Sequence, residues 1–478
     1  MRRTKIVATI GPSSSDEGVL RKMMEAGMDV ARLNFSHSSY ADHERNFRKI
    51  RRLGDRLGKP VGIIGDLQGP KIRTGDLADG PLNLRQGGAL VITTRKIKGA
   101  GDTISTTYPE LHKDVKAGDR ILLDDGSMEV RVVKVENRDI HCRVVYGGLL
   151  RAHKGINLPG VKVSAPSLTP KDKEDVRFAV RLGLDYLAMS FVRRPDDIKF
   201  LKNMLRKLGA KIPVIAKIEK PDALTNIDGI ISVADGIMIA RGDLGVEMAP
   251  EKVPQIQKDL IMRCIEAGKP VITATQMLES MIRQPTPTRA EASDVVNAIY
   301  DGTGAVMLSG ETAVGDYPVH AVKMMARIAE EADTRVIEIE KKVFRRSGVI
   351  DSFEDAIGQA TDTTARHLRT RFIVCFTSSG FTAQQVSSYR PEAPIIAATH
   401  NPEILTRMSL CWGVQTICVR KAKTVDSMIA NIVQELRRRK MVRNGDSIII
   451  TAGYPLGVSG TTNMMQLVKV GEKGKRGR

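Results

Sequence analysis

The segments PVIAKIE (residues 213–219) and GIMIARGDLG (residues 236–245) decide the fold expected for this chain of 478 residues. Each is an apolar run that ends in charged residues, and a helix-sized segment separates them. Near-continuous apolar strands joined by helices are typical of parallel sheets that are buried on both faces. Because side chains alternate along a strand, Lys217 and Glu219 lie on one face of the first strand, and Asp243 follows the second.

This lysine and the two carboxylates allow two interpretations. A lysine and a carboxylate that point into a protein interior are unfavourable unless other charges compensate them. A structural ion pair between Lys217 and Glu219 would meet that need. Alternatively, two hard oxygen ligands and one ammonium group would suit Mg²⁺ and a phosphorylated substrate.

Eight short apolar runs alternate with helical patterns, which is the number of βα units in a closed (β/α)₈ TIM barrel. In that fold the chemistry lies at the C-terminal ends of the strands. Polar residues recur at those ends, which favours a functional site. The runs are KIVATIG (5–11), DVARLNF (29–35), VGIIGDL (61–67), LDYLAMSF (184–191), PVIAKIE (213–219), GIMIARGD (236–243), VITATQM (271–277) and AVMLSGE (305–311). The polar residues are Arg32, Asn34, Ser36, Asp66, Lys217, Glu219, Asp243, Thr275, Ser309 and Glu311.

Two regions depart from the barrel pattern. Residues 71–165 contain short alternating runs between Gly and Asp turns, which predicts a small β-barrel lid domain of antiparallel strands inserted after the third strand. Such a lid would exclude water from a site at the barrel mouth. The barrel is expected to comprise residues 1–70 and 166–334, resuming with Thr169 as N-cap and Pro170 at N1 of a helix. Residues 335–478 predict a C-terminal open α/β domain with strands at FIVCFT, PIIAATH, GVQTICV and SIIITAG.

Composition narrows the function classes. No apolar run is long enough to cross a membrane, and the five scattered cysteines lack any CxxC spacing, which favours reduced thiols in a cytoplasmic protein. The net charge of +19 is compatible with nucleic acid or with small acidic substrates. The basic residues are mixed with acidic ones on many helices and no nucleic-acid-binding motif accompanies them, so a solvated basic surface is expected. Only residues 471–478 resemble a flexible basic tail.

Ten motifs in order resemble the pyruvate kinase family. They are TKIVATIGPSS, ARLNFSH, GDLQGPKIRTG, KGINLPG, AKIEKPDAL, IARGDLGVE, ATQMLESM, MLSGETAVGDYP, TSSGFTAQQVSSYRP and GTTN. The resemblance extends from Thr4 to about Val470. It implies a cytoplasmic, homotetrameric enzyme that transfers the phosphoryl group of phosphoenolpyruvate to ADP with Mg²⁺ or Mn²⁺, giving pyruvate and ATP in glycolysis.

The resemblance also implies roles for individual residues. Glu219 and Asp243 would hold the divalent metal, and Lys217 would contact the transferring phosphoryl group and the developing enolate, where positive charge is needed. Arg32 would add a cationic contact to the phosphoryl group. The backbone N–H groups of Gly242 and Asp243 would receive the substrate carboxylate, and Thr275 would line the face on which the enolate is protonated. The nucleotide side would comprise Asn34, His37, Arg73 and Lys154, with Asp125 in the lid turn.

Several of these roles have structural alternatives. Arg32 would also satisfy a simple ion pair with Asp66 across neighbouring strand ends. His37 would equally serve as a hydrogen-bonded loop residue, and Thr275 as a packing residue of the barrel.

One departure from the family pattern concerns the monovalent cation. Members that need K⁺ carry glutamate where this chain has Lys71, whereas the cation ligands Asn34, Ser36, Asp66 and the Leu67 position remain. A lysine ammonium is a compact unit charge on a flexible stem. We therefore expect Lys71 to take the electrostatic role of K⁺ and the activity not to require that ion.

The C-terminal region contains a candidate effector site. A strand leads into Thr377, Ser378, Ser379 and Gly380, and Thr382 lies at the start of the following helix. Hydroxyl and N–H groups at a helix N-terminus bind anions, so an allosteric phosphorylated effector is expected there. An ordinary strand–helix turn with an N-cap is the alternative.

Two other functions remain open at this stage. A Mg²⁺-dependent aldolase or lyase acting on pyruvate enolates would use a similar barrel site. A basic nucleic-acid-binding protein with a defunct barrel site would show salt-dependent retention on DNA or RNA and no turnover.

Overall fold

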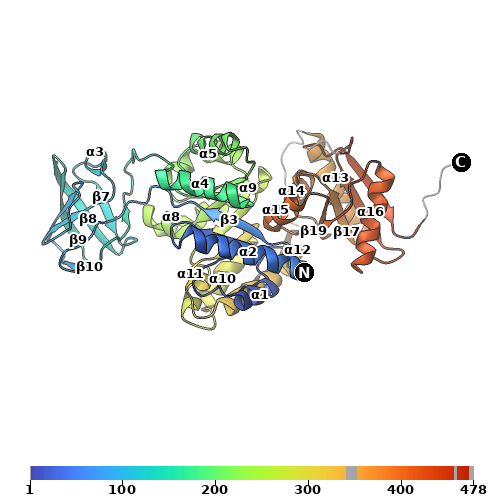
Figure 1. Ribbon diagram of the computed structural model, residues 1–478, viewed down its shortest axis with the longest axis horizontal. Helices are drawn as coiled ribbons and strands as arrows, with labels where there is room; N and C mark the ends of the chain where they lie inside the picture. The colour runs from blue at the N-terminus through green and yellow to red at the C-terminus, as the bar shows by residue number, and fades with distance from the viewer. Residues whose placement is uncertain (1, 341–351, 457–459, 473–478) are drawn as a thin grey trace.

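An eight-stranded parallel barrel forms the centre of the computed structural model, which describes residues 2–340, 352–456 and 460–472 (Figure 1). The strands close in the order β1-β16-β15-β14-β13-β12-β3-β2, which confirms the eight predicted runs. Their bounds are β1 (Lys5–Thr9), β2 (Val30–Asn34), β3 (Gly62–Asp66), β12 (Tyr186–Met189), β13 (Val214–Ile218), β14 (Gly236–Ala240), β15 (Val271–Ala274) and β16 (Ala305–Leu308).

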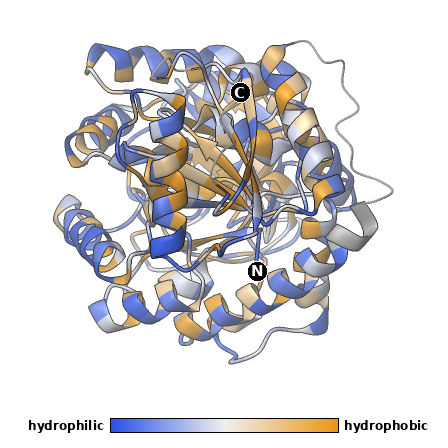
Figure 2. Ribbon diagram, turned by 90° about the vertical axis from the view of Figure 1, so that its right-hand side faces the viewer, coloured by the Kyte–Doolittle hydropathy of each residue, from blue (hydrophilic) through white to orange (hydrophobic). Residues whose placement is uncertain are grey.

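The helices of the barrel cover its outer face and bury a second apolar layer against the strands. Figure 2 shows helices that carry both hydrophilic and hydrophobic residues around mostly hydrophobic strands, as expected for amphipathic helices. At α4, Thr169 accepts a hydrogen bond from the Asp172 N–H and Pro170 occupies N1, as predicted. The elements are α1 (Glu17–Ala26), α2 (Tyr40–Leu57), α4 (Pro170–Leu182), α5 (Pro195–Lys207), α6 (Pro221–Thr225), α7 (Ile227–Val233), α8 (Arg241–Glu247), η1 (Pro250–Lys252), α9 (Val253–Glu266), η2 (Glu279–Ile282), α10 (Arg289–Tyr300), α11 (Gly310–Ala313) and α12 (Pro318–Glu340).

The segment inserted after β3 extends away from the barrel at one end of the molecule (Figure 1). Its strands form a six-stranded sheet, in the order β11-β7-β8-β9-β5-β6, and a two-stranded ribbon of β10 and β4. The expectation of antiparallel pairing holds except between β5 and β6, which run parallel because residues 94–102 cross over before β6 begins. The elements are β4 (Leu82–Leu84), β5 (Ala89–Thr93), β6 (Thr103–Ser105), α3 (Leu111–Asp114), β7 (Arg120–Leu123), β8 (Met128–Glu136), β9 (Asp139–Tyr146), β10 (Gly148–Leu150) and β11 (Ile156–Asn157).

The C-terminal segment contains a five-stranded sheet in the order β19-β18-β17-β20-β21. Its four predicted strands are parallel, and an additional strand, β21, pairs antiparallel with β20 at the edge. The predicted boundary between residues 334 and 335 falls inside α12. The elements are α13 (Phe353–Leu368), β17 (Phe372–Phe376), α14 (Phe381–Ser388), β18 (Ile395–Thr399), α15 (Pro402–Arg407), η3 (Met408–Leu410), β19 (Val414–Cys418), α16 (Val425–Arg438), β20 (Ser447–Ala452) and β21 (Met464–Lys469).

The C-terminal segment contacts the barrel at the N-terminal ends of its strands. Lys5 Nζ, at the start of β1, donates to the Val414 carbonyl at 2.7 Å, and the Tyr186 hydroxyl, at the start of β12, donates to the Arg407 carbonyl at 2.6 Å. The inserted segment instead leaves from the C-terminal end of β3. The C-terminal segment and the inserted segment therefore lie at opposite ends of the barrel strands.

Two further expectations, on membrane spans and on the basic tail, can be compared only with the residues that the structure describes. Within the described ranges, no helix is both long enough and apolar enough to traverse a bilayer. Most of the expected basic tail, residues 473–478, lies outside the described residues.

Candidate active site at the C-terminal end of the barrel

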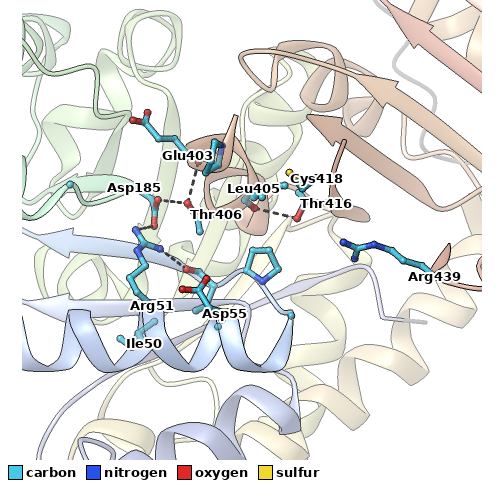
Figure 3. A pocket seen from close by; sticks show the side chains of 16 residues that line it. Ile50, Arg51, Asp55, Asp185, Glu403, Leu405, Thr406, Thr416, Cys418 and Arg439 are labelled. Carbon is cyan, nitrogen blue, oxygen red and sulfur yellow. Dashed lines mark hydrogen bonds and ion pairs between the residues drawn. The ribbon is translucent and has the colours of Figure 1, made fainter. Parts of the chain in front are cut away.

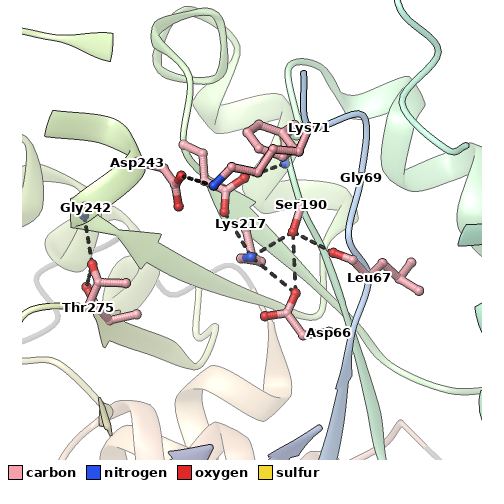
Figure 4. A network of polar contacts seen from close by, with 12 residues as sticks. Asp66, Leu67, Gly69, Lys71, Ser190, Lys217, Gly242, Asp243 and Thr275 are labelled. Carbon is pink, nitrogen blue, oxygen red and sulfur yellow. Dashed lines mark hydrogen bonds and ion pairs between the residues drawn. The ribbon is translucent and has the colours of Figure 1, made fainter. Parts of the chain in front are cut away.

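Lys217, on β13, lies at the centre of a buried polar cluster (Figure 4). Its Nζ is 2.7 Å from Ser190 Oγ, 3.0 Å from Glu219 Oε1 and 3.2 Å from Asp66 Oδ1. Burial by itself lowers the pKa of Lys217, but the charges of Asp66 and Glu219 outweigh burial and raise that pKa above its ordinary value. The site therefore keeps a fixed positive charge at neutral pH. The predicted Lys217–Glu219 contact is present.

Arg32, on β2, is held by Asp66 at the end of the neighbouring strand β3. Its Nε donates to Asp66 Oδ2 at 2.6 Å, and a terminal nitrogen donates to Thr9 Oγ1 at 3.0 Å. Burial favours a raised pKa for Asp66, but Lys217 and Arg32 overcome it and the pKa is lowered. The ion pair considered as an alternative role for Arg32 thus exists, and it also fixes the guanidinium group beside Lys217.

Glu219 and Asp243 form the pair of carboxylates expected to hold a metal. Glu219 Oε2 accepts a hydrogen bond from the Phe191 N–H at 2.7 Å. Burial raises the pKa of Glu219, and the nearby charge of Asp243 raises it further, against the effect of Lys217. Asp243 Oδ1 lies 3.6 Å from Lys71 Nζ. Two hard, mutually repelling oxygen groups fit a divalent ion such as Mg²⁺. Among the described residues, no group of three or more His, Cys, Asp or Glu is arranged to hold a metal.

Gly242 and Thr275 contact each other across the strand ends of β14 and β15. The Gly242 N–H, expected to receive a substrate carboxylate, donates to Thr275 Oγ1 at 2.8 Å. Thr275 has a φ of +68° and Gln276 a φ of +56°. A β-branched residue in this left-handed region is strained by about 1–3 kcal/mol, and such strain clusters at functional sites. The hydrogen bond joins Thr275 to Gly242 at the C-terminal end of the barrel strands.

The four residues expected on the nucleotide side come from the end of β2, the turn after it and the two segments that connect the insertion to the barrel. Asn34 ends β2 and His37 is exposed in the following turn, whereas Arg73 and Lys154 lie on the two chains that connect the inserted segment to the barrel. Partial desolvation lowers the pKa of the His37 ring, and the charges of Arg73, Arg32 and Lys71 lower it further. Lys154 instead pairs with Asp124 of the inserted segment at 2.9 Å.

The contact made by Lys71 differs from the one expected. Its ammonium group pairs with Asp243, on the divalent-metal side, whereas Asn34, Ser36 and Asp66 had been expected as its neighbours. Asn34 Oδ1 accepts the Ser36 N–H at 3.1 Å, and the Leu67 carbonyl accepts from Ser190 Oγ at 2.7 Å. The choice of Asp243 by Lys71 has an electrostatic reason. Lys217 and Arg32 already neutralise Asp66, whereas the charge of Asp243 is not compensated by either of them.

Comparisons with known proteins agree with this geometry. The family model described as "Pyruvate kinase, barrel domain" matches residues 1–322, and that described as "Pyruvate kinase, alpha/beta domain" matches residues 355–468. The chain belongs to the pyruvate kinase family. Pyruvate kinases of Staphylococcus aureus (strain MRSA252) and Staphylococcus saprophyticus are each 47% identical to it; the alignments cover 99% and 100% of this chain and 81% and 82% of theirs. A crystal structure of a Cryptosporidium parvum pyruvate kinase superimposes with a TM-score of 0.90 at 37% identity, covering 98% of this chain and 96% of that one.

Membership of the pyruvate kinase family identifies the chain as a phosphotransferase with phosphoenolpyruvate and ADP as substrates. The family generally uses a divalent metal. The described cluster places the ammonium group of Lys217 among the carboxylates of Asp66 and Glu219.

Sequence reasoning missed two parts of this polar cluster. Ser190 donates to Leu67 and contacts Lys217, and Phe191, at a φ of +54°, presents its N–H to Glu219. Ser190 follows the apolar run of β12, so the strand-end pattern could have found it. No local signal predicts the contact of Phe191.

The loop proposed for an effector makes one hydrogen bond within itself and one to a distant segment. The Gly380 N–H donates to Thr377 Oγ1 at 2.8 Å, and the hydroxyls of Thr382 and Thr462 are 2.8 Å apart. Ser378 and Ser379 are more exposed than the buried Thr377 and Thr382. The structure thus brings the GTTN motif, through Thr462, to the same loop.

A cavity of about 460 Å³ lies between the barrel and the C-terminal segment (Figure 3). Arg51 donates to Asp185 at 2.7 Å, and Thr406 Oγ1 donates to the same carboxylate at 2.5 Å. Asp185 precedes β12, so this cavity lies at the N-terminal end of the barrel, far from the cluster around Lys217.

Proposed function

We propose that this chain is a Mg²⁺-dependent pyruvate kinase whose reaction takes place at the cluster around Lys217. The observation that carries this proposal is the ammonium of Lys217, 3.0 Å from Glu219 and 3.2 Å from Asp66, with the charge of a third carboxylate, Asp243, acting on Glu219. A fixed positive charge next to a carboxylate pair suits an anionic substrate and a divalent cation together.

In the proposed reaction, the bond between the enol oxygen and phosphorus breaks and a bond from a terminal phosphate oxygen of ADP to that phosphorus forms. Lys217 and Arg32 hold positive charge against the transferring phosphoryl group, which spreads negative charge over its oxygens in the transition state. Glu219 and Asp243 would hold the divalent ion, which would supply further positive charge to the anionic substrate. The enolate then takes up a proton on the face lined by Thr275.

The binding of each substrate follows from the same arrangement. The substrate carboxylate would take the Gly242 and Asp243 N–H groups, displacing Thr275 Oγ1 from Gly242. Freed from that contact, the Thr275 hydroxyl would face the enolate. Asn34, His37, Arg73 and Lys154 would contact ADP, since they border the cluster from the β2 turn and from the connecting chains.

We further propose that Lys71 removes the need for K⁺. Its side chain is partly exposed and long enough to change partner when Asp243 engages a metal. Pyruvate formation from phosphoenolpyruvate and ADP with Mg²⁺ is expected to proceed fully in buffer free of K⁺ and NH₄⁺. KCl is expected to raise the steady-state rate of Lys71→Glu by at least about tenfold, because the substitution replaces a positive charge by a negative one. Steady-state rates with and without 100 mM KCl measure this difference.

Lys98→Glu, an exposed lysine of the inserted segment, is the matched control and is expected to stay independent of K⁺. A Lys71→Glu variant equally active with and without KCl would contradict the role of Lys71. Absence of turnover under all conditions, with Mn²⁺ and phosphorylated effectors included, would instead favour the lyase or the nucleic-acid-binding alternative.

We propose allosteric regulation through Thr377, Ser378, Ser379, Gly380 and Thr382. Hydroxyl and N–H groups at the start of α14 suit a phosphate group, and the hydrogen bonds of the loop preorganise them. A sugar phosphate or nucleoside monophosphate is expected to lower the half-saturating concentration of phosphoenolpyruvate. Thr382→Ala, which removes the contact with Thr462, and Ser379→Asp, which adds a repelling charge, are expected to weaken that response about tenfold or more.

The control for this prediction is Gln434→Glu, which adds the same charge on an exposed face of α16. An unchanged half-saturation with every phosphorylated candidate, in the parent chain and in both variants, would count against an effector site at this loop.

A cytoplasmic location and a homotetrameric assembly complete the proposal. The scattered, unpaired cysteines support a reducing compartment. Strand β21 forms an outer edge of the C-terminal sheet, and Leu467 on it is 49% exposed, which supports self-association at that edge.

A further inference from the structure

Glu247 is a buried carboxylate to which neither the sequence patterns nor the reaction assigned a role. It ends α8, and only 1% of its side chain is exposed. Its Oε1 accepts hydrogen bonds from Asn157 Nδ2, at 2.8 Å, and from the ammonium group of Lys220. Asn157 belongs to β11 of the inserted segment, so Glu247 joins this segment to the barrel.

Helix α8 carries Glu247 and Asp243 on the same face. The two residues are four positions apart, which places their side chains one above the other about 6 Å along the helix axis. Asp243 contacts Lys71, and Glu247 contacts Asn157. One face of this short helix therefore meets both chains that connect the inserted segment to the barrel.

These two connecting chains form a single ribbon. Arg73 and Gly155 pair in an antiparallel bridge, and the Ile156 N–H donates to the Ile72 carbonyl at 2.9 Å. The Thr74 N–H donates to the Lys154 carbonyl at 2.8 Å. Because backbone hydrogen bonds join the chains, a rotation of the inserted segment would move Lys71 and Asn157 together over the face of α8.

A second path leads from Glu247 to Glu219. Lys220, the partner of Glu247, directly follows Glu219 in the chain, and its ammonium lies 6.0 Å from the centre of the Phe191 ring. The Phe191 N–H donates to Glu219 Oε2. Glu247 is thus linked to Asp243 through α8 and to Glu219 through Lys220 and Phe191.

We propose that Glu247 is a positioning residue that transmits the orientation of the inserted segment, through Asn157, to the carboxylates of Asp243 and Glu219. This inference rests on the proposed role of those two carboxylates in holding the divalent metal. The inserted segment, expected to act as a lid that excludes water, would then have a second role, because the position of this segment would set the geometry of the metal ligands.

The test compares the affinity of the free protein for Mn²⁺, measured by electron paramagnetic resonance, in Asn157→Ala, Glu247→Gln and the double variant. Substitution of residues that orient metal ligands typically weakens metal binding by about 10–100-fold. Asn157 contacts Glu247 and not the proposed metal ligands themselves, so Asn157→Ala is expected to raise the Kd for Mn²⁺ by only about 3- to 10-fold. Because Asn157 acts through Glu247, the double variant is expected to bind no more weakly than Glu247→Gln alone.

The controls are Asn83→Ala, an exposed asparagine on β4, and Glu251→Gln, an exposed carboxylate four residues after Glu247. Both are expected to leave the Kd unchanged. Asn157→Ala retains the Lys220–Glu247 ion pair, so it keeps the test informative if Glu247→Gln fails to fold. At saturating Mn²⁺, the kcat of Asn157→Ala and of Glu247→Gln is expected to lie within about twofold of the parent value, since only the positioning of the metal ligands is impaired.

Two outcomes would overturn the inference alone. A Kd within twofold of the parent value in Asn157→Ala, while Asp243→Asn raises it strongly, would show that the inserted segment does not act on the metal ligands. Fully additive effects of Asn157→Ala and Glu247→Gln would show that the two residues act separately. If neither Asp243→Asn nor Glu219→Gln weakens Mn²⁺ binding, the metal assignment fails and this inference fails with it.

Discussion

Replacement of Lys217 by methionine is expected to lower kcat by about 10³-fold or more. The ammonium group of Lys217 is held by Ser190, Glu219 and Asp66 at 2.7–3.2 Å, so its charge is fixed before the reaction begins. Removal of one preorganised charge at a transition state typically costs about 3–4 kcal/mol, and cationic contacts in phosphoryl transfer reach 10³–10⁵-fold in rate. Steady-state formation of pyruvate with Mg²⁺ and saturating ADP measures the loss.

Stability has to be separated from catalysis in this variant. Loss of Lys217 leaves Asp66 and Glu219 without their shared cation, and breaking a buried pair typically destabilises a protein by about 3–5 kcal/mol. Thermal unfolding followed by circular dichroism reports that effect independently of activity. Lys207→Met, at the exposed end of α5, is the matched control and is expected to change neither quantity. A folded Lys217→Met protein that retains more than a tenth of the parent kcat would refute the role of this lysine.

Neutralising either carboxylate of the proposed metal pair is expected to weaken divalent-metal binding by at least about tenfold. Glu219→Gln and Asp243→Asn keep the size of the side chains but remove one negative charge each, and hard divalent cations bind carboxylates far better than amides. The remaining carboxylate would also keep its lysine partner, Lys71 or Lys217, as a competing cation. Titration with Mn²⁺ followed by electron paramagnetic resonance measures the Kd directly.

The same substitutions are expected to lower activity at limiting Mg²⁺ and to recover part of it at high Mg²⁺. Asp196→Asn, an exposed residue at the start of α5, is the control and is expected to bind Mn²⁺ as the parent does. Unchanged Mn²⁺ affinity in both Glu219→Gln and Asp243→Asn would exclude them as the metal ligands and direct attention to other oxygen groups of the cluster.

The core of the candidate site was predictable because it depends on strand geometry. Lys217 and Glu219 share a face since side chains alternate with a period of two, and their ion pair is present at 3.0 Å. Arg32 lies on β2 and Asp66 ends the neighbouring strand β3 of a closed barrel, so their contact follows once strand order is known. The strained φ of Thr275 was not predictable, because it depends on how the turn after β15 packs against α8.

The eight strands, the position of the insertion, the parallel strands of the C-terminal sheet and the charged strand-end residues were all predictable from the sequence. These features follow from hydrophobic periodicity, which is local and repeats along each segment. Only the tertiary structure decided that Lys71 pairs with Asp243, that Ser190 and Phe191 support Lys217 and Glu219, and that Thr462 meets Thr382. It also decided that Asn157 and Glu247, 90 positions apart, share a buried hydrogen bond. Such partners are chosen by closure of the barrel and by competition among neighbouring charges, which no local pattern encodes.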